Sequence, residues 1–134
     1  MVHRDLKPEK LAERGWPTRF TGILTNPPYA IAQQFLEQSL EVADEVILLL
    51  RLSWLESKDR VELLRAFTPD VYVLPNRPSF TGNGKTDGAA YAWMRWRLAQ
   101  KAREAGEIRV LQNTPKDVRI ADRTQQQLRT RHLD

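Results

Sequence analysis

The sequence predicts an α/β domain built around a parallel sheet, and two observations lead to this fold class. The first is a short apolar run at 22–25, followed by an amphipathic stretch at 30–43 and by the continuous apolar run 46–50. Apolar residues at three- and four-residue spacing indicate a helix, whereas an unbroken short apolar run is typical of a strand buried on both faces. The second is a later pair of strand-like stretches, 71–74 and 89–96. Strand, helix, strand in this order is the crossover unit of parallel sheets.

The helix expected over 30–43 covers one face of the sheet. Its predicted inner positions recur at helical spacing and are Ile31, Phe35, Leu36, Leu40 and Ala43. Ser53 and Glu56 have the spacing of a capping box, which predicts that the next helix opens there. The inner face of that helix would then be Val61, Leu64 and Phe67.

Two polar segments flank the predicted core at 20–96. Residues 1–19 read as an arm with a short charged helix over 6–14, ended by Gly15-Trp16-Pro17. Residues 97–134 read as a basic helix over 97–105, a short apolar piece at 108–111 and a polar tail. No internal repeat and no second domain is indicated.

Composition narrows the classes of function. The chain has no cysteine, and its two histidines, His3 and His132, lie at opposite ends, so no metal site is predicted. No apolar run is long enough to cross a bilayer and the amino terminus does not resemble a signal peptide, so a cytoplasmic location is expected. Residues 97–134 hold 9 Lys and Arg against 5 Asp and Glu, whereas residues 1–96 hold 12 of each, so the tail supplies the net charge of +4. Such a tail suits either contact with a polyanion or a plain solvated helix.

The stretch at 3–9 is similar to the catalytic loop of protein kinases. In that loop an asparagine follows the aspartate five residues later, but Lys10 stands at the corresponding position here. No Asp-Phe-Gly follows and no glycine-rich loop precedes it, so the kinase interpretation is rejected.

The tetrapeptide Asn26-Pro27-Pro28-Tyr29 is the strongest candidate site, because it joins the first predicted strand to the first predicted helix. Each proline fixes its own φ and restricts the residue before it, so a stiff, extended lip is expected, with the helix beginning near Ala30. The Asn26 side-chain oxygen and the Pro27 backbone oxygen can both accept hydrogen bonds from one amino group, and the Tyr29 ring offers a stacking face. A ligand-free strand-to-helix turn is the plain alternative.

Further candidates come from the loop at 75–88 and from the ends of the later strands. Lys85 lies in a glycine-rich stretch at 82–86 that lacks the spacing of a phosphate loop and suits a flexible substrate loop better. Arg51, at the carboxyl end of the central strand, suits a phosphate contact or a structural ion pair. Trp54 suits base stacking or, more readily, the core. Tyr91, Trp93 and Trp96 are interpreted mainly as packing residues, with one face as a candidate interface.

Residues 20–96 resemble the carboxyl half of adenine-specific DNA methyltransferases of the class I, Rossmann-like fold, in particular short phage and prophage proteins. The resemblance rests on the Asn-Pro-Pro-Tyr motif at 26–29, on Leu50-Arg51-Leu52 and on Arg77-Pro78-Ser79-Phe80-Thr81-Gly82. It implies about four strands, corresponding to strands four to seven of that fold, with flanking helices. It also implies S-adenosylmethionine as methyl donor and a nucleic acid, with DNA favoured, as substrate. Residues 26–29 would hold the target base, and Phe80 would be a second aromatic against it.

The resemblance leaves out the cofactor half of that fold. About twenty residues precede Gly22, and they contain no strand followed by a glycine-rich turn and a helix, so the donor pocket is incomplete in this sequence. The strand at 22–25 is therefore expected at a sheet edge, covered by a second copy, by a complementary cofactor-binding subunit or by the arm. Two readings remain: the target-base half of a methyltransferase, or a non-catalytic module that binds nucleic acid or protein.

Overall fold

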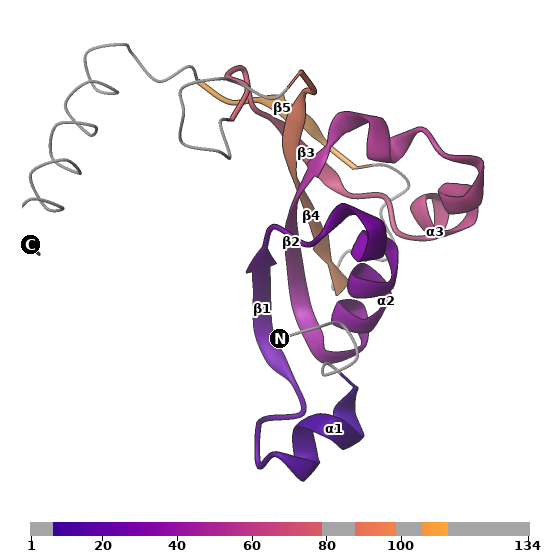
Figure 1. The fold of residues 1–134 in the computed structure, drawn as a ribbon, viewed down its shortest axis with the longest axis vertical. Coiled ribbons are helices and arrows are strands. Elements are labelled where there is room, and N and C mark those ends of the chain that lie inside the picture. Colours follow the sequence, from indigo (N-terminus) through magenta and orange to yellow (C-terminus); the bar gives the residue numbers. More distant parts are fainter. Residues whose placement is uncertain (1–6, 79–87, 99–105, 113–134) are drawn as a thin grey trace, which may run out of the picture.

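The structure is a computed structural model, and it describes residues 7–78, 88–98 and 106–112 (Figure 1). Five strands form one mixed sheet in the spatial order β1-β2-β4-β3-β5. The bounds are Phe20–Thr25 for β1, Ala43–Arg51 for β2, Asp70–Val73 for β3, Tyr91–Arg97 for β4 and Ile108–Val110 for β5. The α/β class predicted from the sequence is therefore confirmed.

The two outer pairings of this sheet are parallel and the two inner pairings are antiparallel. Strand β1 runs parallel to β2, with Ile23 beside Val46, and β2 runs antiparallel to β4 on its other side. Strand β2 is thus flanked on both sides, as its apolar sequence predicts. Strands β3 and β4 pair antiparallel, as expected for 71–74 and 89–96, and β5 joins β3 in parallel.

The helix after β1 forms in two steps. A single 3-10 turn, Tyr29–Ile31, leads into α2, Ala32–Val42, so regular helix starts two residues later than predicted. The helix ends directly at Ala43, which takes an extended conformation and starts β2. Of the predicted inner positions, Phe35 and Leu36 are buried and Leu40 packs against the core, while Ala43 is buried as part of the strand.

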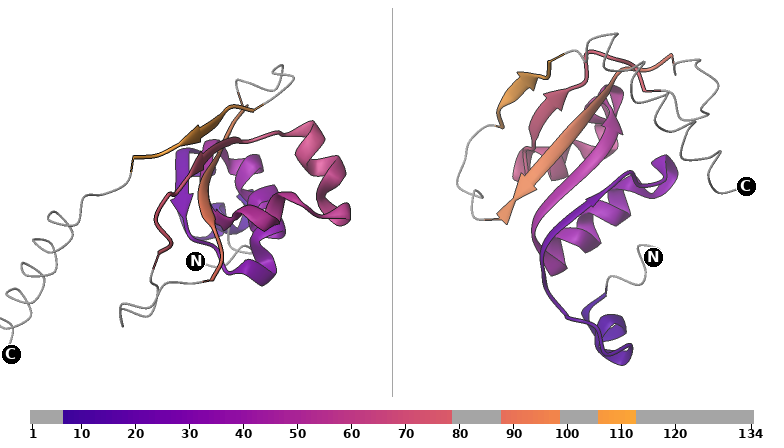
Figure 2. Two further views of the ribbon diagram at one scale, coloured as in Figure 1. Left: turned by 90° about the horizontal axis from the view of Figure 1, so that it is seen from above. Right: turned by 90° about the vertical axis from the view of Figure 1, so that its left-hand side faces the viewer.

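The hydrophobic core lies between the sheet and its helices. Alternate side chains of β2 (Val46, Leu48, Leu50) and of β4 (Ala92, Met94, Trp96) belong to one buried cluster with α2. Among the described residues, α2 and α3, Val61–Ala66, lie on the same face of the sheet (Figure 2). No helix in these residues is long and apolar enough to cross a membrane.

The predicted capping box at Ser53 is wrong. The chain leaves β2 through a 3-10 turn, Leu52–Leu55, that buries Trp54, and a second 3-10 turn, Lys58–Arg60, precedes α3. Helix α3 therefore begins at Val61, with no side-chain cap. Trp54 is buried in the core, so the chain turns there. Ser53 therefore lies in the 3-10 turn and not at the start of α3. Val61 is also 43% exposed and does not face the core, whereas Leu64 and Phe67 do.

The arm carries α1, Pro8–Glu13, which agrees with the short charged helix expected there. Leu11 is completely buried, and the backbone N–H of Trp16 donates to the Leu11 carbonyl across the turn. Gly15 takes a φ of 69° in this turn, a conformation that side chains disfavour. Helix α1 therefore ends just before Gly15, as predicted.

Strand β5 is the main addition to the predicted architecture. The sequence indicates about four strands, whereas residues 108–110 form a fifth beside β3. Asp70 holds this edge together: one carboxylate oxygen accepts from the Glu107 backbone N–H at 2.8 Å, and the other accepts from Arg97 at 2.9 Å. Gly106 is required beside it, because a Cβ atom would lie 1.8 Å from the Pro69 carbonyl oxygen.

Replacing Asp70 with Asn is expected to lower the free energy of unfolding by about 1.5–3 kcal/mol. Asp70 is only 4% exposed, so the amide would leave Arg97 without its carboxylate in a poorly solvated position. Urea denaturation followed by circular dichroism measures the change. Asp59→Asn, at an exposed position, is the matched control. Equal stability of the two variants would contradict this role of Asp70.

Candidate functional site

Within the Asn26–Tyr29 lip, Pro28 has an extended backbone and Tyr29 begins the 3-10 turn. Pro28 has φ −55° and ψ 131°, and its carbonyl accepts from the Ile31 backbone N–H at 3.1 Å, which closes the 3-10 turn. Pro27 is buried, whereas Asn26 is exposed and Tyr29 is 50% exposed. The buried proline anchors the lip, and the polar and aromatic side chains on either side of it remain accessible.

The lip borders a pocket of about 170 Å³ at the carboxyl ends of the two parallel strands. Open α/β sheets place ligands at this end, because loops diverge there above the strand termini. The pocket is lined by Asn26, Pro27, Tyr29, Leu49, Leu50, Arg51 and Tyr91. Sites for drug-sized ligands enclose roughly 300–1,000 Å³, so this pocket has room for one flat ring system rather than a large cofactor.

Arg51 lies inside this pocket between two tyrosines. Its guanidinium carbon is 5.4 Å from the centroid of the Tyr29 ring, which is a cation–π distance. Its Nε–H donates to the Tyr91 hydroxyl at 3.2 Å. These two contacts are both with aromatic side chains, and the phosphate and ion-pair interpretations of Arg51 stay predictions.

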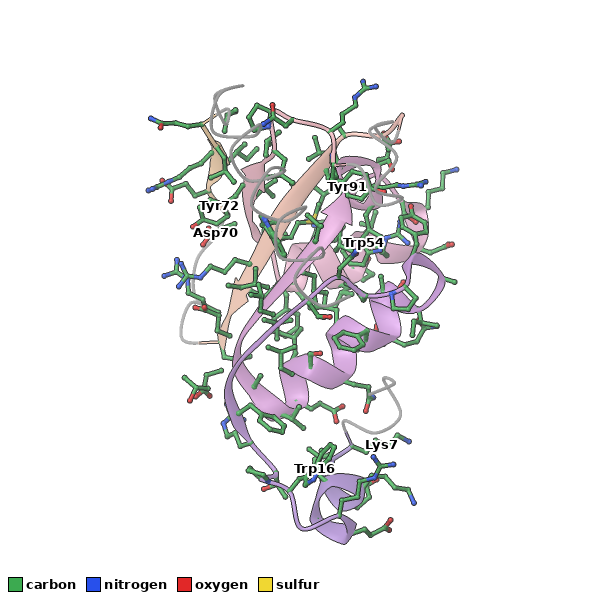
Figure 3. All side chains as sticks on the ribbon, turned by 60° about the vertical axis from the view of Figure 1, so that its left-hand side comes forward. Lys7, Trp16, Trp54, Asp70, Tyr72 and Tyr91 are labelled. Carbon is green, nitrogen blue, oxygen red and sulfur yellow. The ribbon has the colours of Figure 1, made fainter. Side chains whose placement is uncertain are left out.

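Tyr91 is a pocket residue that the sequence analysis interprets mainly as packing. It starts β4 and is labelled in Figure 3. It pairs with Arg51 in the antiparallel register and is 8% exposed. Its role depends on which residue of β2 it faces, and a single sequence does not give that register across a long loop. The interpretation of Tyr91 as mainly a packing residue is incomplete.

The remaining candidates fall into two groups. Phe80 and Lys85 lie outside the described residues. Trp54 is 1% exposed and meets the Trp96 ring edge to face, with centroids 6.1 Å apart, so it belongs to the core and not to the pocket. The Trp96 indole N–H donates to the Phe67 carbonyl at 2.8 Å, which confirms its packing role.

Arg95 and Arg97 of β4 alternate with the core residues Met94 and Trp96 and therefore lie on the other face of the sheet. Arg95 forms an ion pair with Glu45 at 2.6 Å. The pKa of Arg95 is raised, first by this hydrogen bond to Glu45 and then by one to Tyr72. Arg95 and Arg97 are thus both paired with carboxylates, and they stabilise the sheet.

Within the described residues, no cluster of three His, Cys, Asp or Glu side chains is placed to hold a metal ion. The residues that line the pocket supply the Asn26 and Pro27 oxygens as acceptors, the Tyr29 ring as an aromatic face and Arg51 as a cation. This set suits a neutral, flat ring that carries an amino group.

Comparisons with protein-family models, with curated proteins and with solved structures find no match for this chain.

Proposed function

We propose that this chain binds the target base of an adenine-N6 DNA methyltransferase. The observation that carries the proposal is the pocket at the ends of β1 and β2, where Asn26 and Pro27 lie beside the Tyr29 ring. Two acceptor oxygens that hydrogen-bond to one exocyclic amino group polarise its N–H bonds and increase the electron density on nitrogen. Such a group is a better nucleophile toward a methyl donor without a strong base.

The arrangement of strands supports the same proposal. Strand β1 leads into the motif, β2 is flanked on both sides, and β3 and β4 are antiparallel beyond it. This is the arrangement that the resemblance to the carboxyl half of class I methyltransferases implies for strands four to seven.

The described pocket is small for a nucleoside cofactor. Its volume of about 170 Å³ lies below the roughly 300–1,000 Å³ of sites for drug-sized ligands. The proposal therefore assigns base binding to this chain and the donor site to a second copy or to a complementary subunit. A module that binds a base without transferring a methyl group is the second candidate, and the same small volume favours it.

Calorimetric titration with single-stranded oligonucleotides tests base recognition. One oligonucleotide contains a central adenine, and the matched one contains purine, which lacks the amino group. We expect the adenine form to bind about tenfold more tightly, because two hydrogen bonds of ordinary strength are lost with purine. Equal affinities would show that the amino group is not read. Binding heat on adding S-adenosylmethionine would support the methyltransferase, and its absence would support the binding module.

A strand from a partner chain would pair with the outer edge of β1. In the described sheet β1 is a terminal strand, it contains no charged residue or proline, and Leu24 is 67% exposed. Natural edge strands are usually protected by such residues or by a covering segment. The strand therefore suits pairing with a further strand from a second chain.

Leu24→Lys is expected to weaken self-association at least tenfold, because burying a leucine contributes about 1.5–3 kcal/mol. Sedimentation equilibrium over a range of concentrations measures this. Val61→Lys, an exposed apolar position on α3, serves as the control and should leave association unchanged. A wild-type chain that stays monomeric at every concentration would rule out the homo-oligomer and leave a separate subunit or the amino-terminal arm as the cover of this edge.

A further inference from the structure

Two aromatic side chains lie on the face of the sheet opposite α2 and α3, and we call them the aromatic row. Helices α2 and α3 pack on one face (Figure 2). Trp93 of β4 alternates with the core residues Ala92 and Met94, so its side chain is directed to the other face. Tyr72 of β3 pairs with Trp93 in the antiparallel register and therefore shares that face. Both side chains of the aromatic row are partly exposed.

The aromatic row adjoins the pocket. Leu49 lines the pocket and pairs with Trp93 in the β2–β4 register, and Trp93 pairs in turn with Tyr72. Directly opposite residues of antiparallel strands share a face, with Cβ atoms about 4.5–5.5 Å apart. Trp93 and Tyr72 are therefore one and two strands away from the pocket wall, on the surface that continues from it.

The arginines near the aromatic row are matched by carboxylates. Arg95 pairs with Glu45, Arg97 with Asp70 and Arg109 with Glu107. Because each of these cations already has a carboxylate partner, attraction of phosphate is not the main contribution that this surface offers. Its contribution is aromatic contact, and a base can stack on an aromatic side chain whatever its sequence identity.

Resting on the proposed function, we infer that the bases beside the target adenine in a single DNA strand stack on Trp93 and Tyr72. A base in the pocket is joined to its neighbours through the phosphodiester chain, so the neighbours have to lie on surfaces that adjoin the pocket. The aromatic row is such a surface. Open sheet faces with aromatic side chains stack two or three unpaired bases in some nucleic-acid-binding domains.

A second copy of this chain is the rival occupant, because Tyr, Trp and Arg are also enriched at protein interfaces. The continuity of the aromatic row with the pocket through Leu49 favours the nucleic acid. A protein partner has no need of that continuity, whereas a strand that places one base in the pocket does.

Two short single-stranded DNAs with a central adenine test this inference, with binding to the full chain followed by fluorescence anisotropy. One strand has thymine at every flanking position. The other has abasic sites on both sides of the adenine, which keeps the phosphates and removes the bases. Wild type is expected to bind the thymine-flanked strand at least about fivefold more tightly, because each base stacked on an aromatic side chain strengthens binding by at least that factor.

Trp93→Ala is expected to remove this preference and to leave the affinity for the abasic-flanked strand unchanged. The dependence of binding on salt concentration should also stay the same, since the lost contact is with a base and not with a phosphate. Trp93→Leu keeps an apolar side chain without a flat ring, so it should behave like Trp93→Ala with less effect on the fold. Tyr72→Phe keeps the ring and should keep the preference.

Trp16→Ala is the matched control. Trp16 is 42% exposed and lies at the opposite end of the molecule from Tyr72 (Figure 3). The substitution removes an exposed indole away from the aromatic row and should change the affinity for neither strand.

Selective loss of the thymine-flanked strand in both Trp93 variants is the supporting result. Equal weakening of both strands would overturn the inference, because Trp93 would then only support the pocket wall at Leu49. Equal wild-type affinities for the two strands, with adenine still preferred to purine, would reject the aromatic row and leave the base pocket intact. Loss of self-association in Trp93→Leu without a change in DNA binding would assign this face to a second copy instead. Absence of binding to either strand in wild type would overturn the proposed function and this inference with it.

Discussion

Replacing Trp54 with Ala is expected to destabilise the protein by about 3–5 kcal/mol, the range for removing a buried tryptophan. Trp54 is 1% exposed and meets Trp96 edge to face with an interplanar angle of 82°. The Arg60 guanidinium lies 4.7 Å from the Trp54 ring centroid, and Arg60 Nε donates to the Trp54 carbonyl at 2.9 Å. The substitution would therefore remove the contact that holds the segment after β2 against the core.

Urea denaturation followed by far-ultraviolet circular dichroism measures this loss. Single domains have unfolding free energies of about 5–15 kcal/mol, so we expect the variant to retain less than half of the wild-type value or to be largely unfolded. Trp54→Phe keeps most of the apolar volume and should cost much less. A loss below about 1 kcal/mol for Trp54→Ala would contradict its assignment to the core.

The first half of the sheet can be predicted from sequence because its signals are local. The unbroken apolar run of β2 and the helical spacing of Phe35 and Leu36 record burial directly. The antiparallel pair β3 and β4 follows from their apolar runs as well, since each side of the intervening loop is strongly strand-forming.

Strand β5 and the start of α3 could not be predicted, because both depend on tertiary contacts. Residues 108–110 are exposed and too few to show a period; their pairing with β3 depends on Asp70, a residue more than thirty positions away. Likewise the spacing of Ser53 and Glu56 indicates a cap, but burial of Trp54 between them imposes a 3-10 turn instead.

The site divides in the same way. The Asn26–Tyr29 lip is visible in the sequence because proline restricts the backbone locally, whatever surrounds it. The part played by Tyr91 appears only when β4 is placed against β2, forty residues earlier, with Arg51 facing it. Local chemistry thus gives the acceptors of the pocket, and strand register gives its far wall.

Replacing Asn26 with Ala is expected to lower methyl transfer by about 10²–10³-fold in the assembly that contains the donor site, as loss of one preorganised polar group does in other enzymes. The reason is that one of the two acceptors for the adenine amino group is removed while the Tyr29 stacking face remains. Single-turnover transfer of a labelled methyl group to adenine-containing DNA measures the rate.

Two comparisons separate this effect from damage to the fold. Asn26 is exposed, so the free energy of unfolding of Asn26→Ala should stay within about 0.5 kcal/mol of wild type. Asn26→Asp keeps an acceptor oxygen at the same distance from the backbone and should restore part of the rate, whereas Asn26→Gln moves the amide by one methylene and should not. A rate for Asn26→Ala within a few fold of wild type would mean that the Pro27 carbonyl alone orients the base, and that the Asn26 side chain has no part in the chemistry.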